Sequence, residues 1–106
     1  MDNNAINEAF VRAFLSMAGF DDHVAPWKDT YIMRDSVGPP VLVVVRNGAV
    51  SVGYGMATHT TAVKVSAQIP LSTDTEVFAR RLQNSINEVM NDPRRTYQGS
   101  GETGSG

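Results

Sequence analysis

The sequence predicts an α+β domain in which two helices pack on one face of a three- to four-stranded antiparallel sheet. Apolar residues recur at helical spacing near both ends of the chain, and between them residues 41–54 form a hairpin pattern around Asn47-Gly48. Residues 60–69 alternate between apolar and polar side chains. A two-layer sandwich buries the apolar sides of two amphipathic helices against the apolar face of a sheet. The expected order is α-(β)-β-β-β-α, where the first strand is optional.

The first helix is expected over residues 4–18, with Asn3 or Asn4 as its N-terminal cap and Gly19 at its C-terminal end. Its apolar stripe comprises Ile6, Phe10, Phe14 and Met17, widened by Ala9, Ala13 and Leu15. Such a stripe either binds a partner or packs on the protein's own sheet. We favour packing, because an isolated helix of this length is only marginally stable in water.

Residues 20–29 are expected to be irregular, because Asp21-Asp22 and Pro26 interrupt regular structure. Trp27 is the single tryptophan, and its large ring is expected to close one end of the core. A short strand over residues 31–33 can follow, before Gly38-Pro39-Pro40 ends it.

The hairpin is the strongest local prediction. Asn47-Gly48 tolerates the positive φ angles of a type I′ turn, and a two-residue turn determines the register of both strands. Arg46 is then paired with Ala49, and Val41 with Tyr54. One face of the hairpin becomes the core face and carries Val41, Val43, Val45, Val50, Val52 and Tyr54.

The other face of the hairpin is more apolar than a face in contact with water should be. The uncharged run over residues 41–45 has high β-propensity and would be an aggregation hazard if exposed. Either residues 20–37 of the same chain cover this face, or another chain does. We expect the interface of the protein here, on Leu42, Val44, Arg46 and Ser51.

A further strand is expected over residues 60–69. Its apolar side carries Val63, Val65, Ala67 and Ile69, and its polar side, which includes Ser66, is expected to face water. Pro70 ends the strand.

The second helix is expected to begin after Ser72, with Thr73 and Glu76 as a capping box and Asp74 at the positive end of the helix. Its inner face carries Phe78, Leu82, Ile86, Val89 and Met90, and Asn91-Asp92-Pro93 ends it. The domain is thus expected to span residues 1–93, followed by a flexible polar Gly/Ser tail over 94–106. The basic pair at 94–95 is expected to interact with the negative C-terminal end of the helix.

Composition argues against several classes of partner. A length of 106 residues suits one domain, and a net charge of −2 provides no basic surface for nucleic acid. The chain has no cysteine, which excludes disulfides and zinc–thiolate sites. The apolar run over residues 10–17 is too short to cross a bilayer, and the first residues lack the basic start of a signal peptide. We expect no membrane partner, and residence in the cytoplasm, or in a virion if the chain is encoded by a phage.

No catalytic or metal-binding constellation is evident. His23 follows Asp21-Asp22 with no second histidine nearby, and no carboxylate or nucleophile is linked to His59 by spacing. Gly53-Tyr54-Gly55 lacks the context of a phosphate-binding loop. We expect no enzymatic activity, no cofactor, no metal and no small-molecule substrate.

The sequence therefore predicts a non-enzymatic assembly or interaction protein that binds itself or another protein, with a homo-oligomer favoured. The order of elements is similar to that of small phage head–tail joining and tail-terminator proteins and of secretion chaperones. That similarity concerns the fold and rests on no motif, so no residue roles follow from it. The alternative is a small monomeric inhibitor or adaptor that binds a protein target through its loops.

Overall fold

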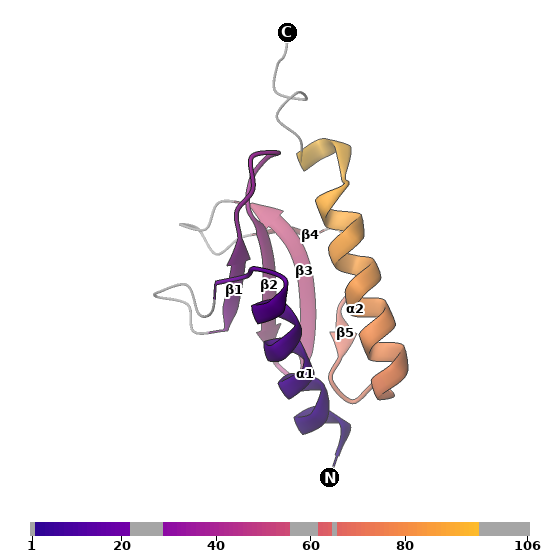
Figure 1. The fold of residues 1–106 in the computed structure, drawn as a ribbon. Coiled ribbons are helices and arrows are strands. Elements are labelled where there is room, and N and C mark those ends of the chain that lie inside the picture. Colours follow the sequence, from indigo (N-terminus) through magenta and orange to yellow (C-terminus); the bar gives the residue numbers. More distant parts are fainter. Residues whose placement is uncertain (1, 22–28, 56–61, 65, 96–106) are drawn as a thin grey trace, which may run out of the picture.

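Two helices lie side by side on one face of an antiparallel sheet (Figure 1). The computed structural model describes residues 2–21, 29–55, 62–64 and 66–95, and for 62–64 it describes the backbone alone. Strands follow the order β1-β2-β3-β4, and β5 also pairs with β3. This confirms the predicted fold class. The elements are α1 (Asn3–Met17), β1 (Thr30–Met33), β2 (Val41–Arg46), β3 (Ala49–Gly55), β4 (Ala62–Lys64), β5 (Ile69–Pro70), α2 (Thr75–Met90) and the 3-10 helix η2 (Pro93–Arg95).

The hairpin has the predicted register. Val41 faces Tyr54 and Arg46 faces Ala49, as the two-residue turn requires. Asn47 and Gly48 have φ angles of 55° and 74°, which few residues other than asparagine and glycine adopt without strain. The optional first strand is also present, since β1 pairs with β2 and places Ile32 beside Leu42.

The core lies between the helices and the predicted face of the hairpin. Phe10 of α1 and Phe78 of α2 join the two helices in an edge-on contact, with ring centroids 6.3 Å apart. Half-buried Val45 packs against this core. The buried residues that the sheet contributes are Tyr31, Val41, Val43, Val50, Val52, Tyr54 and Ile69.

The expected continuous strand over residues 60–69 is wrong, because the segment is divided into β4 and β5. Gly53 of β3 pairs with Lys64, and Val50 of β3 pairs with Ile69. The two pairs are thus three residues apart along β3 but five residues apart along the segment that contains β4 and β5. Ser66 lies at this interruption. It is buried rather than exposed to water as expected, and its hydroxyl donates to the carbonyl of Val52 (3.1 Å) and accepts from its N–H (3.3 Å). A side chain thus replaces the missing backbone partner.

Helix α1 is rotated about its axis from the predicted orientation. Asn7, Val11 and Leu15 face the core, while Phe10 and Phe14 are only partly buried. Ile6 and Met17, expected inside, are exposed. The reason is Asn7, whose amide donates to the carbonyls of Leu71 (2.7 Å) and Thr73 (2.8 Å), so that a polar residue takes a core position. The cap also differs, since Asp2 accepts from the N–H of Ala5.

Helix α2 has the predicted inner face, with Phe78, Leu82, Ile86 and Val89 buried and Met90 partly buried. Its N-terminus differs from the prediction. The cap is Asp74 rather than Thr73, so the expected capping box with Glu76 is not formed, and the Asp74 side chain makes no capping hydrogen bond with the described residues.

Packed structure continues past residue 93 as far as Arg95, which is fully buried in η2. Its guanidinium donates to the carbonyl of Met90 at 3.2 Å, so this residue of the basic pair interacts with the end of the second helix as expected, whereas Arg94 pairs with Asp92. The Gly/Ser tail beyond it, together with Trp27, His23 and His59, lies outside the described residues.

Candidate interaction surface

The outer face of the hairpin, where the sequence placed the interface, is partly enclosed within the chain itself. Leu42 is 1% exposed, as is Ile32 beside it in β1. Val44 and Ser51 are half-buried and face each other across β2 and β3. As the structure stands, Leu42 has no surface to offer a partner, and this face presents only its half-buried members and Arg46.

Arg46 is exposed but engaged in an ion pair with Asp29, which precedes β1. Its Nε and Nη2 atoms donate to the two carboxylate oxygens at 2.6 and 3.1 Å. The Arg46 hydrogen bond lowers the pKa of Asp29, so the pair persists into acid. This bidentate pair connects the start of β1 to the end of β2.

A different apolar surface is exposed on α1. Met17 is 90% exposed and Ile6 37% exposed, and three alanines four residues apart are also exposed on the same helix. Half-buried Phe10 borders this surface on the side of α2. We call it the α1 outer face, and it consists of Ala5, Ile6, Ala9, Ala13 and Met17.

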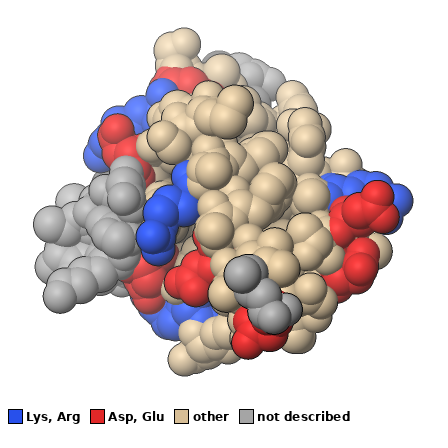
Figure 2. Space-filling view, turned by 60° about the horizontal axis from the view of Figure 1, so that its bottom comes forward, with Lys and Arg blue, Asp and Glu red and all other residues tan. Residues whose placement is uncertain are grey.

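Helix α2 provides an internal comparison, because it packs on the same face of the same sheet. Its exposed positions are polar or charged: Glu76, Arg80, Arg81, Gln83, Asn84, Asn87 and Glu88. That is the usual surface of a helix in water. Figure 2 shows the molecule from the end where α1 begins: a broad central area carries no Lys, Arg, Asp or Glu, and charged side chains gather toward its edges. The lack of charge is therefore a property of one region and not of the whole surface.

The described edge of the sheet at β1 is already partly paired. Asp21 bridges to Ile32 by two backbone hydrogen bonds, of 2.7 and 3.1 Å. On the opposite side, the interruption at Ser66 leaves only short strands. Paired and interrupted edges are poor templates for adding a strand from another chain.

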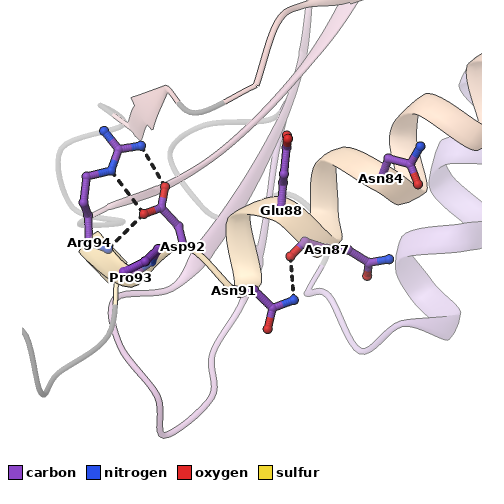
Figure 3. Close-up of a pocket in the computed structure, with 7 residues that line it drawn as sticks. All are labelled: Asn84, Asn87, Glu88, Asn91, Asp92, Pro93 and Arg94. Carbon is purple, nitrogen blue, oxygen red and sulfur yellow. Dashed lines mark hydrogen bonds and ion pairs between the residues drawn. The ribbon is translucent and has the colours of Figure 1, made fainter.

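An open groove of about 790 Å³ runs along the C-terminal half of α2 and reaches η2 (Figure 3). Two carboxylates line it, Glu88 and Asp92, and Asp92 accepts from the Nη2 of Arg94 at 2.7 Å. The side-chain hydrogen bond from Arg94 lowers the pKa of Asp92, which makes this carboxylate a weaker base. Asn91 donates to the carbonyl of Asn87. Asp92, Arg94 and Asn91 are thus engaged within the fold, and the remaining polar side chains of the groove are spread along one helix rather than converging on a common point.

Within the described residues, no group of three His, Cys, Asp or Glu side chains is arranged to hold a metal ion. The same part of the chain contains no helix of the length and apolar character needed to cross a membrane. Comparison of the chain with protein-family models, with curated proteins and with solved structures finds no match.

The sequence pattern does not predict the α1 outer face, because helical spacing assigns four of its five residues, Ile6, Ala9, Ala13 and Met17, to the core. A signal was present, since Asn7, Val11 and Leu15 recur at a four-residue spacing. A stripe that begins with asparagine does not have the apolar character of a core face, although a buried amide is stable when backbone carbonyls accept its hydrogen bonds.

Proposed function

We propose that this chain is a non-enzymatic assembly protein that associates with further copies of itself through the α1 outer face. The observation that supports the proposal is the contrast between the two helices. Every exposed residue of α2 is polar or charged, whereas α1 exposes Ile6, Met17 and a row of alanines beside its polar residues. Removing apolar surface from water contributes about 25 cal/mol per Å². A contiguous apolar area on a small domain is a common mark of an interface.

A structural role in a larger particle, in the cytoplasm or in a virion, is part of the same proposal. The order of elements, similar to that of phage head–tail and tail-terminator proteins, is its only support.

Light scattering of the full chain over a wide concentration range tests the proposal. We expect a multimer, which Ala9→Glu combined with Met17→Glu converts to a folded monomer because each charge would be buried in the contact. Gln83→Glu adds a charge to the exposed face of α2 and is the matched control, expected to leave the mass unchanged. A wild-type chain that remains monomeric at high concentration would contradict self-assembly and favour a monomeric inhibitor or adaptor.

A further inference from the structure

The exposed side of α1 is built from three rows of side chains, and successive residues within a row are four positions apart in the sequence. The central row is opposite the buried stripe of Asn7, Val11 and Leu15, so it points away from the sheet. It consists of Ala5, Ala9, Ala13 and Met17, all exposed.

The two flanking rows differ in character. The row on the side of α2 is bulky, and its Phe10 and Phe14 rings lie 5.7 Å apart. The row on the side of β1 is polar, since Arg12 and Ser16 line a small cavity of about 130 Å³ together with Tyr31. Glu8, one turn before Arg12, belongs to the same polar row.

We propose that α1 pairs with α1 of a second copy in an antiparallel arrangement about a two-fold axis. Ala9 of each chain lies against Ala13 of the other, and Ala5 lies against Met17. The inference deepens the proposed function and rests on it, because it specifies how the copies meet.

Size complementarity is the first reason for the antiparallel arrangement. The central row is small at three positions and large at the fourth. An antiparallel two-fold places the large Met17 over the small Ala5 at both ends, and alanines meet at the centre, where they permit close approach of the two backbones. A parallel pairing would instead set Met17 against Met17 and hold the helices apart.

Charge complementarity is the second reason. An antiparallel two-fold keeps equivalent flanking rows together, so the polar row of one copy runs beside the polar row of the other. Because the order is reversed, Glu8 of each chain lies beside Arg12 of its partner. The bulky rows meet on the other flank, where Phe10 lies near Phe14 of the partner. The face therefore matches itself in both size and charge.

Disulfide mapping tests the arrangement directly, since the chain contains no cysteine. Ala5 and Met17 are separated by about 18 Å along the helix at 1.5 Å per residue. In the antiparallel pair, two copies of Ala5→Cys, or two copies of Met17→Cys, would be about that far apart, well beyond the roughly 7 Å that a disulfide spans. We expect neither variant to crosslink alone, and a mixture of the two to give the mixed disulfide. Gln83→Cys on α2 is the control and is expected to form no crosslink.

A charge exchange provides a second readout. Glu8→Arg is expected to weaken the dimer about two- to fivefold, and Glu8→Arg with Arg12→Glu to restore it. Glu88→Arg on α2 is expected to leave it unchanged.

The outcomes separate this inference from the proposed function. Crosslinking of each single variant with itself would show a parallel pair and overturn the inference while leaving self-assembly standing. A stable multimer with no crosslink at either α1 position, alone or mixed, would also overturn it, because the contact would then lie elsewhere. A strict monomer would contradict both.

Discussion

Arg95 Nη2 donates to Asp35 Oδ1 at 2.7 Å and so joins two residues 60 positions apart. The Arg95 side chain is fully buried, and its guanidinium also donates to the carbonyls of Pro39 and Met90. One side chain thereby connects the segment between β1 and β2 to the end of α2. We expect Arg95→Ala to lower the free energy of unfolding by about 3 kcal/mol, because a buried side chain is lost and three partly buried acceptors lose their donor.

Urea denaturation measures this loss. Arg95→Lys is expected to recover part of it, since an ammonium cannot reach three acceptors in the plane of a guanidinium. Arg94→Ala is the neighbouring control, with an exposed ion pair to Asp92, and should change the free energy by less than about 1 kcal/mol. Equal losses for both alanine variants would show that the Arg95 contacts do not stabilise the fold.

The Asp35 carboxyl makes this connection sensitive to acid. Partial burial opposes its ionisation, but hydrogen bonds from the Val37 N–H and from Arg95 outweigh that effect, so the pKa of Asp35 lies below its ordinary value. Its contribution to stability is therefore present above the unfolded-state pKa of about 3.9 and is lost as the pH falls through the folded-state pKa. Thermal unfolding of the wild type and of Asp35→Asn between neutral and acid pH should show two curves that converge as the pH falls. Curves that remain parallel would contradict the assignment.

Gly38 lies directly against the backbone of Arg95. A Cβ atom at this position would overlap the carbonyl oxygen of Arg95. We expect Gly38→Ala to lower the free energy of unfolding by more than about 2 kcal/mol, because backbone must move on one side of the contact. Gly48→Ala is a useful comparison. A Cβ atom at position 48 would meet no atom within 4 Å, but the alanine would have to adopt a φ of 74°, which costs about 1 kcal/mol. Chemical denaturation measures the loss in free energy of unfolding for both variants. A larger loss for Gly48→Ala than for Gly38→Ala would contradict the prediction.

The parts of the fold that follow from local rules could be predicted from the sequence. Asn47-Gly48 determined the hairpin register, and the α2 stripe from Phe78 to Val89 contains no polar residue that competes for the core. The errors occur where a polar side chain is satisfied by distant backbone. Asn7 binds carbonyls more than 60 residues away, and Ser66 replaces a backbone partner of Val52. No periodicity reveals such partners, so the four-residue spacing of Asn7, Val11 and Leu15 could be assigned to the core only once the carbonyls that accept from Asn7 were located in three dimensions.

Leu42 tests whether the outer hairpin face belongs to the interior. Because its side chain is 1% exposed, Leu42→Glu would bury a charge, and we expect it to unfold the domain or to lower the free energy of unfolding by several kcal/mol. Val44→Glu, at a half-buried position, should have a clearly smaller effect. Thermal melts followed by circular dichroism compare the stability of the two variants. A folded Leu42→Glu chain with altered mass would return the interface to the hairpin.

Asn7→Asp changes a single buried group from donor to acceptor and gives the sharpest test of how α1 is held. The Asn7 amide nitrogen donates to the carbonyls of Leu71 and Thr73, whereas an ionised aspartate would set its oxygens against both. We expect a loss of about 3 kcal/mol at neutral pH.

A protonated carboxyl in the Asn7→Asp variant could still donate one of these hydrogen bonds, so the folded-state pKa of the new carboxyl should rise above the unfolded value of about 3.9. The penalty from ionisation is then absent below that pH and grows as the pH rises toward the folded-state pKa. Denaturation at several pH values should show Asn7→Asp approaching the wild type in acid, whereas Asn7→Ala remains at a constant distance from it. If the two variants instead show the same pH dependence, the amide contacts do not determine the orientation of α1, and the exposed row of alanines would need another explanation.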